Sequence, residues 1–542
     1  MRTLRLVGEV RKLDSVDIAV VGAGFAGLYM LHRARGLGLT ARVFEAGSDL
    51  GGTWFWNRYP GARCDIESVE YSYSFDHDLE QEWEWTERYA TQPEILRYLN
   101  HVADRFDLRG DITFDTRVTA AHFDDEGKST WQVTTDQGEQ ITARFVVMAT
   151  GCLSSANTPS FVGIDEFGGR LLHTGQWPHE PVDLTGKRVA VIGTGSSAIQ
   201  SIPIIAEQAE QLTVFQRTAS YTVPAHNGPL DPVEVASIKQ RYDDFRDENR
   251  AMTGAFGSRL PKGDVAVAAV SEAERIGALE QRWMHGGLPF INAFTDILLD
   301  PSSNDLVADF VRDKVRSIVD DPLVADKLAP TTTIGCKRLC VDTGYYATFN
   351  RDNVELIDIN DEPIERFTPS GLIAGGVERQ FDVIVLATGF DAMTGTLMKI
   401  DIRGRDGLAL QTKWEAGPRT YLGLQIAGFP NLFLVTGPGS PSVLTNMVMS
   451  IEHHVNWISE CIAHLNEHGQ QVIEANVKAE DQWVDHVNMV ASFTLFPTCN
   501  SWYLGANIPG KQRVFMPLPG FPGYVDQCNQ IVADNYRGFV LT

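Results

Sequence analysis

A short apolar run that ends in glycines occurs twice in this chain and organises the predicted elements. The first copy covers residues 17–27 and the second covers residues 188–198. A short continuous apolar run is typical of a strand covered on both faces, and the glycines after it predict a tight turn that opens a helix. The turn residues are Gly22, Gly24 and Gly27 in the first copy and Gly193, Gly195 and Ala198 in the second.

Glycines at this spacing, between a strand and a helix, are typical of dinucleotide-binding sites. They let the backbone approach a pyrophosphate, which then faces the free N–H groups and the positive dipole end of the helix. One copy alone could be a glycine turn without a ligand, but two copies in the same context favour two cofactors. The residues predicted to line the two turns are Gly22, Gly24, Phe25, Ala26 and Gly27, and then Thr194, Gly195, Ser196 and Ser197.

The end of each second strand separates the two sites. The first ends in Glu45, whose carboxylate can accept both ribose hydroxyls of an adenosine, as an FAD site requires. The second ends in Gln216 and Arg217, where a cation replaces the acid. A 2′-phosphate repels a carboxylate and binds a guanidinium, so we expect NADP at this site. The alternative for Arg217 is a solvated surface arginine.

Two further apolar strands, residues 145–151 and 382–389, both end in Ala-Thr-Gly. They predict returns of the chain to each sheet, so the two domains are interleaved. The fold class is therefore α/β, with two Rossmann-like dinucleotide-binding domains and a helical insertion in the NADP domain. The predicted segments are 1–152 (FAD domain, first part), 153–220 (NADP domain, first part), 221–330 (insertion), 331–385 (NADP domain, second part) and 386–542 (FAD domain, second part, and C-terminal segment).

Helical patterns fill the predicted insertion. Ser271 and Glu274 have the spacing of a capping box, and apolar residues recur at helical spacing from Asn304 until Asp321 and Pro322.

Composition excludes several classes of function. The net charge of −24 argues against binding to nucleic acid or to an anionic membrane surface. No apolar run approaches the roughly 20 residues that span a bilayer, and residues 1–16 have no apolar region typical of a signal peptide. The seven cysteines are scattered, and Cys336 and Cys340 have no second pair or nearby His for zinc. We expect no metal, free thiols and a cytoplasmic location.

The residues from Phe167 to Pro178 carry the most specific motif. Phe167, Gly169, His173, Trp177 and Pro178 match the pattern F-x-G-x-x-x-H-x-x-x-W-P just before the second glycine motif. A disulfide reductase would need a cysteine pair where this chain has Gly51 to Trp54. The chain thus resembles the type I Baeyer–Villiger monooxygenases, most closely the phenylacetone- and steroid-oxidising members, and the similarity covers nearly its whole length.

That resemblance implies a reaction and a set of roles. The reaction oxidises ketones, here aromatic, bulky or polycyclic ones, to esters or lactones with NADPH and O₂ through a C4a-peroxyflavin. Arg338 would be held over the flavin with Asp65 as its partner, and Lys337 would join Arg217 at the 2′-phosphate. The remaining residues implied are Gly52, Thr53, Trp54 and Thr218 beside the cofactors, Ser442, Val443, Leu444 and Trp502 around the substrate, and Phe167, Gly169, His173 and Trp177 in the linker between domains.

The chemistry of these residue types agrees with the implied roles. A guanidinium can stabilise a developing oxyanion without giving up its proton, whereas a Lys or His could protonate it. A structural Asp65–Arg338 ion pair and a purely structural His173 remain alternatives. So do a heteroatom oxygenase, a non-oxygenating NADPH oxidase or reductase, and a flavoprotein with only a binding role. We expect a monomer, although the sequence leaves the oligomeric state open.

Overall fold

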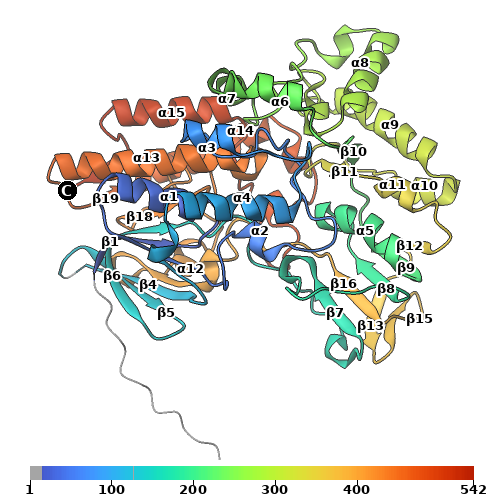
Figure 1. The fold of residues 1–542 in the computed structure, drawn as a ribbon, viewed down its shortest axis with the longest axis horizontal. Coiled ribbons are helices and arrows are strands. Elements are labelled where there is room, and N and C mark those ends of the chain that lie inside the picture. The colour runs from blue at the N-terminus through green and yellow to red at the C-terminus, as the bar shows by residue number, and fades with distance from the viewer. Residues whose placement is uncertain (1–14, 126) are drawn as a thin grey trace, which may run out of the picture.

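The structure is a computed structural model that describes residues 15–125 and 127–542. The predicted absence of a signal peptide concerns residues 1–16 and therefore lies almost entirely outside the described part. Two sheets lie side by side at the base of the molecule, and helices cover them (Figure 1). The first sheet contains β1 (Val16–Val21), which pairs in parallel with β2 and β6 and is buried over its C-terminal half.

The first sheet draws its strands from two distant parts of the chain. Its order is β17-β4-β5-β6-β1-β2-β3, and β18 also pairs with β6. β17 pairs with β4 at one edge and β18 pairs with β6, the neighbour of β1, so residues after 400 return to the first sheet, as an interleaved chain requires. The other strands are β2 (Ala41–Phe44), β3 (Ile112–Thr113), β4 (Val118–Asp124), β5 (Thr130–Thr135), β6 (Gln140–Met148), β17 (Asp401–Arg403) and β18 (Leu432–Leu434).

Helix α1 (Phe25–Gly36) follows β1 and packs against the long helix α13 (Met447–Glu467). Both helices bury apolar side chains in one core, so the start of the chain packs against its C-terminal part. The remaining elements of this half are α2 (Thr53–Trp56), α3 (His77–Glu82), α4 (Gln92–Arg105), α12 (Leu410–Lys413), α14 (Val477–Ser492), α15 (Phe521–Ala533), β19 (Ile473–Ala475) and β20 (Phe539–Leu541).

The second sheet has the order β12-β9-β8-β16-β7, and all its pairs are parallel. An antiparallel three-stranded sheet, β13-β14-β15, extends from it and was not predicted. The prediction of an α/β protein with two Rossmann-like sheets is confirmed. The strands are β7 (Arg170–His173), β8 (Arg188–Ile192), β9 (Gln211–Gln216), β12 (Val354–Asp358), β13 (Ile364–Thr368), β14 (Gly371–Ala374), β15 (Val377–Gln380) and β16 (Val383–Leu386); α5 (Ser196–Gln208) and α11 (Tyr345–Thr348) pack on this half.

The segment between β9 and β12, which separates the two parts of the second sheet in the sequence, is mostly helical and lies at the upper right of Figure 1. The predicted capping box of Ser271 and Glu274 is confirmed at the start of α8. Helix α9 begins at Pro301, earlier than the predicted Asn304, because Asp300 caps it and proline suits the first helical position. The helices are α6 (Pro232–Lys239), α7 (Tyr242–Arg250), α8 (Glu272–His285), α9 (Pro301–Ile318) and α10 (Pro322–Leu328), and β10 (Thr222–Pro224) pairs with β11 (Cys340–Asp342) beside them.

The prediction that all seven cysteines are free is wrong for two of them. Cys336 and Cys499 form a disulfide with a Cα–Cα distance of 6.1 Å, although they lie 163 residues apart in the sequence. The fold brings together the segment before β11 and the segment after α14, a proximity that sequence spacing does not reveal. The other five cysteines are buried free thiols.

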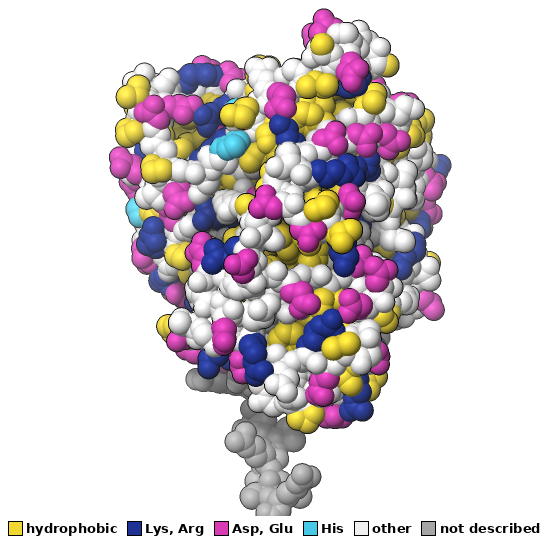
Figure 2. Space-filling view, turned by 90° about the vertical axis from the view of Figure 1, so that its right-hand side faces the viewer, with side chains coloured by type: hydrophobic (Ala, Val, Ile, Leu, Met, Phe, Trp, Pro, Cys, Tyr) yellow, Lys and Arg dark blue, Asp and Glu magenta, His cyan; other side chains and the backbone are white. Residues whose placement is uncertain are grey.

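The surface carries charges of both signs. Figure 2 shows acidic and basic side chains interspersed over the face that carries the second sheet and the insertion, without a large area of one sign. Across residues 15–125 and 127–542, no helix is long and apolar enough to cross a membrane. The same residues include no cluster of side chains suited to hold a metal ion.

Candidate active site

The first glycine turn is a cradle with no room for side chains. Gly22 has φ +104°, and a Cβ there would lie 2.6 Å from the carbonyl oxygen of Ala149. A Cβ on Gly27 would lie 1.8 Å from the carbonyl oxygen of Gly22, so only glycine lets α1 pack this closely on β1. Because Gly24 at the N-cap gives α1 no side-chain cap, its first N–H groups stay free for an anion.

A second pair of glycines meets this turn. A Cβ on Gly24 would lie 3.3 Å from the Cα of Gly52, so the two backbones are in contact. The predicted residues Phe25 and Ala26 bury their side chains in the core and can offer a ligand only backbone groups. Thr53 is exposed at the start of α2, and Trp54 is buried with its indole N–H donated to the Tyr71 hydroxyl at 3.2 Å.

Glu45 lies at the end of β2 beside this cradle. It is 5% exposed, and its two oxygens accept hydrogen bonds from the backbone N–H groups of Ala23 (2.8 Å) and Gly47 (2.7 Å). These bonds fix the carboxylate next to the turn. Each oxygen keeps further acceptor capacity, so the carboxylate can still take hydroxyl donors from a ribose.

The second glycine turn repeats the geometry with one difference. Gly193 has φ +114°, and a Cβ there would meet the carbonyl oxygen of Ala387 at 2.4 Å. Ala198, fully buried, takes the position of Gly27, so the second turn accommodates a methyl group where the first has no room for one. The turn is held by Thr194, whose hydroxyl donates to the carbonyl of Thr218 at 2.9 Å. Ser196 and Ser197 are half-buried at the open start of α5.

Arg217 and Lys337 come from segments far apart in the sequence, and the fold brings them close enough for their charges to interact. Burial lowers the pKa of Lys337, and the positive charge of Arg217 lowers it further. Two positive charges this close repel each other, and an anion bound by both would offset the repulsion. Arg217 is exposed, and Gln216 before it is buried, with its amide donating to the carbonyl of Lys327 at 2.7 Å. The structure thus brings together the two residues predicted to hold a 2′-phosphate.

Arg338 and Asp65 form a two-pronged ion pair. Nε of Arg338 lies 3.0 Å from Oδ2 of Asp65, and Nη2 lies 2.9 Å from Oδ1. Nη1 donates to the backbone carbonyl of Val443 at 2.8 Å. Burial opposes the charge on Arg338, but the Asp65 carboxylate outweighs it, so the pKa of Arg338 lies above its ordinary value. These bonds use three of the five guanidinium N–H groups.

The predicted substrate loop lies beside this pair. The loop forms the turn Ser442–Leu444 ahead of α13, and Ser442 is fixed by its hydroxyl, which donates to the carbonyl of Thr436 at 3.1 Å. Val443 belongs to an apolar cluster that also contains residues with no role predicted from sequence. The cluster consists of Cys152, Leu153, Leu298, Ala392, Met393, Val443, Leu444, Met447, Ala491, Phe496, Trp502, Tyr503, Leu504, Phe515 and Met516.

Tyr503 is a residue that the sequence analysis missed. Burial raises its pKa to about 12, against the opposing effect of the nearby Arg338 charge. Its place directly after Trp502 was the only available signal. Tyr503 and Trp502 therefore extend the wall of the site around the guanidinium.

The linker motif lies at the edge of the second sheet. His173 ends β7, accepts the N–H of Gly175 on Nδ1 (2.9 Å), and directs Nε2 to the carbonyl of Asn157 (3.2 Å). Burial lowers the pKa of His173. Gly169 has no room for a Cβ, which would meet the carbonyl of Asp382 at 2.6 Å. Phe167 and Trp177 pack into the apolar cores on either side of this sheet.

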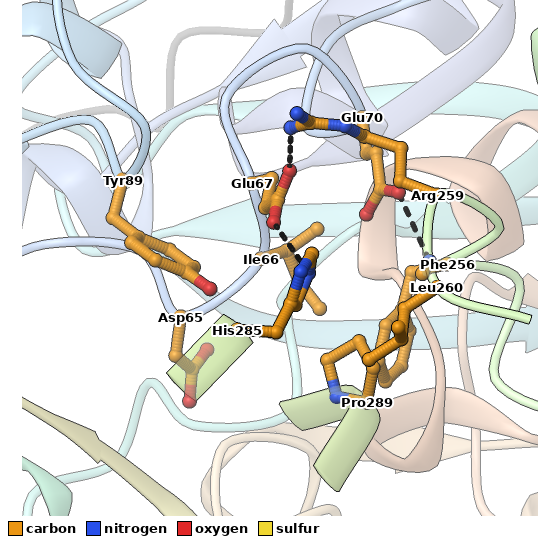
Figure 3. A pocket seen from close by; sticks show the side chains of 11 residues that line it. Asp65, Ile66, Glu67, Glu70, Tyr89, Phe256, Arg259, Leu260, His285 and Pro289 are labelled. Atoms are coloured by element: carbon orange, nitrogen blue, oxygen red, sulfur yellow. Dashed lines mark hydrogen bonds and ion pairs between the residues drawn. The ribbon is translucent and has the colours of Figure 1, made fainter. Parts of the chain in front are cut away.

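A small cavity borders Asp65, and charged groups line it. Figure 3 shows Glu67 between Arg259 and His285, with Glu70 nearby. Glu67 also accepts both Nε and Nη2 of Arg88, so it ties the Asp65 loop to two distant segments. Burial, and then the charge of Glu67, raise the pKa of Glu70 to about 8. The volume of about 10 Å³ admits one water molecule, which excludes a ketone.

The two cradles fit two dinucleotides, and the comparisons with known proteins agree. The family model described as flavin-binding monooxygenase-like matches residues 15–247. A Baeyer–Villiger monooxygenase of Pseudooceanicola batsensis is 44% identical over 97% of this chain and 96% of its own. The structure of an oxidised steroid monooxygenase bound to NADP is 54% identical, with a TM-score of 0.93, over 97% of this chain and 99% of that one.

A further structure shows both cofactors together on this fold. OTEMO in complex with FAD and NADP is 41% identical, with a TM-score of 0.93, and the match covers 97% of this chain and 99% of that one. The expected cofactors, FAD and NADPH, are therefore confirmed, and the two-sheet architecture is that of this group. The chain belongs to the family of flavin-dependent, NADPH-using Baeyer–Villiger monooxygenases.

Proposed function

We propose that this enzyme oxidises bulky apolar ketones, aromatic or polycyclic, to esters or lactones, and that Arg338 with Asp65 acts in the oxygen-transfer step. The observation that carries the proposal is the three-point fixation of Arg338 by Asp65 and the Val443 carbonyl. It links a permanent cation directly to the loop expected at the substrate. The balanced reaction takes up one ketone, O₂, NADPH and a proton, and yields one ester, NADP⁺ and water.

Different residues of the chain would bind the two cofactors and act on the substrate. The glycine turn at Gly22 and the carboxylate of Glu45 would hold FAD, and the turn at Gly193 with Arg217 and Lys337 would hold NADPH. The bound flavin supplies the chemistry that activates oxygen. Arg338 would direct an N–H group that Asp65 and Val443 do not use toward the oxygen where negative charge develops, and it cannot neutralise that charge by proton loss. Asp65 and the Val443 carbonyl would keep the guanidinium in this orientation.

The apolar cluster around Val443 supports the choice of substrate. Its aromatic and aliphatic side chains, among them Met393, Phe515 and Trp502, favour an apolar ketone and keep water away from the reacting oxygen. The 54% identity to a steroid monooxygenase supports a polycyclic substrate further. Apolar walls discriminate weakly between ketones of similar shape, so size is the property we expect to matter most.

A ketone panel tests this proposal. The purified enzyme is incubated with NADPH and air and with a steroid ketone, an aryl ketone, cyclohexanone and cyclopentanone, plus an aryl sulfide for the heteroatom alternative. Mass spectrometry then identifies products heavier by one oxygen. We expect the highest kcat/KM for the steroid or aryl ketone. Turnover confined to the small rings would refute the substrate class, and turnover of the sulfide alone would favour a heteroatom oxygenase.

The division into segments 1–152, 153–220, 221–330, 331–385 and 386–542 remains part of this proposal. It is supported by the way the chain leaves the first sheet after β6, builds the second sheet from β7 to β16, and returns with β17 and β18. We also propose that the enzyme acts as a monomer in the cytoplasm, which the acidic, mixed-charge surface supports.

A further inference from the structure

The disulfide between Cys336 and Cys499 lies at the edge of the proposed site. Cys336 is fully buried and directly precedes Lys337 and Arg338, whereas Cys499 is half-buried between exposed neighbours. The bond therefore joins the segment that carries both cations to the segment that carries Trp502. No role in the proposed mechanism accounts for it.

The segment before the bond is held by isolated hydrogen bonds, among them those from the Tyr221 hydroxyl to the carbonyls of Pro330 and Thr332. Residues 329–339 form no helix or strand between α10 and β11. On one side the segment is held at Ile334, whose backbone N–H and carbonyl bond to the Asn304 side chain at 3.0 and 2.9 Å. On the other side Cys340 donates its N–H to the carbonyl of Tyr221 at 3.1 Å. Cys336 lies between these points, so the disulfide fixes the backbone where the side chains of Lys337 and Arg338 begin.

The segment after α14 is equally irregular. It contains only the short turns Phe496–Thr498 and Trp502–Leu504 until α15 begins. The Thr498 hydroxyl donates to the Thr333 hydroxyl at 3.2 Å, and the Leu495 N–H donates to the Leu298 carbonyl at 2.8 Å. The first bond holds the same pair of segments that the disulfide joins, and the second ties the segment after α14 to the chain just before α9. Hydrogen bonds of this kind are worth only about 1 kcal/mol each.

We propose that the Cys336–Cys499 disulfide is a positioning element of the NADP site. It holds Lys337 at the 2′-phosphate and Arg338 at Tyr503, and its reduction by a dithiol weakens the binding of NADP(H). The proposal deepens the proposed function, on which it rests for the roles of Lys337 and Arg338. Its physical basis is preorganisation, because a cation held by a covalent strut loses less conformational entropy when the phosphate binds.

The redox step balances with a dithiol as reductant. A thiolate of the dithiol attacks Sγ of Cys499, the more exposed sulfur, and the S–S bond breaks with its electron pair leaving on Sγ of Cys336, which takes a proton. The second thiol of the reductant then closes its own disulfide and releases the Cys499 thiol. Two electrons pass from the dithiol to the protein, which gains two thiols.

The other cysteines make the measurement selective. Cys64, Cys152, Cys340, Cys461 and Cys528 are all buried. A maleimide mass tag applied to the native protein therefore reports on the thiol of Cys499 after reduction. Cys461, fully buried in α13, offers a matched control for the loss of one sulfur elsewhere.

The experiment compares the oxidised enzyme with FAD bound, the same enzyme after dithiothreitol, and the variants Cys499→Ser and Cys461→Ser. Calorimetry gives the Kd for NADP⁺ and for 2′,5′-ADP, neither of which requires turnover. We expect reduction and Cys499→Ser each to raise the Kd on the order of fivefold, because part of a charge-assisted contact is lost. Reoxidation should restore the wild-type value, and dithiothreitol should not change the Kd of Cys499→Ser.

Three results would overturn the inference: full reduction at an unchanged Kd, an equal rise in Cys461→Ser, or two untethered thiols in the air-oxidised protein. The Kd measurements and the ketone panel can fail independently of each other. If the Kd shifts while no ketone is oxidised, the substrate proposal fails and the disulfide inference stands. If ketones are oxidised while the Kd stays constant, the disulfide inference fails alone.

Discussion

The two dinucleotide sites share a plan and differ at two positions. At the third glycine position the first site has Gly27, where a Cβ would lie 1.8 Å from the Gly22 carbonyl oxygen, and the second has a buried Ala198. At the end of the second strand the first site has the buried Glu45 and the second has Gln216 with the exposed Arg217. The first site is thus tight and acidic at its ribose end, and the second is looser and cationic.

This difference suits two cofactors with different tasks. A cofactor that stays bound through the cycle benefits from a close backbone cradle and a fixed carboxylate. A cofactor that must enter and leave benefits from a more open turn and from cations that recognise one phosphate. Both sites use the same helix-terminus physics, so the contrast teaches that selectivity lies in the side chains around the turn.

The largest effect should come from the tight turn. Gly27→Ala places a methyl group against the Gly22 carbonyl and must push α1 off β1, so we expect FAD affinity to fall about a hundredfold, or roughly 3 kcal/mol. The matched change is Ala198→Gly at the second site, which should cost only about 0.5–1 kcal/mol of stability and leave FAD bound. The flavin content of both purified variants is measured by absorbance. Full FAD occupancy in Gly27→Ala would break the comparison.

The next effect should come from the cations. Arg217→Ala removes a charge-assisted contact of about 1.5–3 kcal/mol, so the KM for NADPH should rise more than tenfold while NADH use changes little. Lys337→Ala should act in the same direction. Steady-state kinetics with both coenzymes provides the internal control. An equal loss with NADPH and NADH would show that Arg217 supports the fold rather than the phosphate.

A smaller, pH-dependent effect should follow from the pair Arg217 and Lys337. The pKa of Lys337 lies below its ordinary value because of burial and the charge of Arg217. Phosphate binding favours the protonated Lys337 amine. The affinity for 2′,5′-ADP should therefore be highest below the pKa that Lys337 has in the free enzyme, and it should decline as pH rises through that pKa. In Arg217→Ala that decline should move to higher pH. A profile that does not move would mean that the two cations are not coupled.

The sequence predicts a site residue well when the elements around that residue are close to it in the chain, and poorly when they come from distant segments. Gly22, Glu45 and Arg217 could be predicted as cofactor-binding residues because the strand, turn and helix around them are local in the sequence. The pairing of Arg338 with Asp65 was expected only from the family resemblance, and its role remains a proposal. The bond to the Val443 carbonyl was not expected, because a backbone acceptor carries no residue signature.

The errors have separate causes. The Cys336–Cys499 disulfide spans 163 residues, and scattered cysteines carry no sign of their partners. The sheet β13-β14-β15 was missed because its strands are only four or five residues long and β13 and β15 are largely exposed, so they carry no clear apolar pattern. The boundary of α9 was three residues late because the cap at Asp300 precedes the apolar pattern.

The central claim is that Arg338 acts in oxygen transfer rather than in holding NADPH. One preparation of Arg338→Ala, compared with wild type and with Arg338→Lys, is examined in two ways. Stopped-flow absorbance under anaerobic conditions measures flavin reduction by NADPH, and product analysis in air measures ester formation.

We expect flavin reduction in Arg338→Ala within about tenfold of wild type, because hydride transfer builds no oxyanion for the guanidinium to stabilise. Ester formation should fall below about one per cent, since loss of one such stabilising group costs about 10²–10³ in rate. Arg338→Lys should recover only part of the wild-type rate of ester formation, because an ammonium group lacks the planar, two-pronged donor geometry of a guanidinium. If reduction and ester formation instead fall by the same factor, Arg338 serves the NADPH site or the fold, and the proposed role in oxygen transfer is wrong.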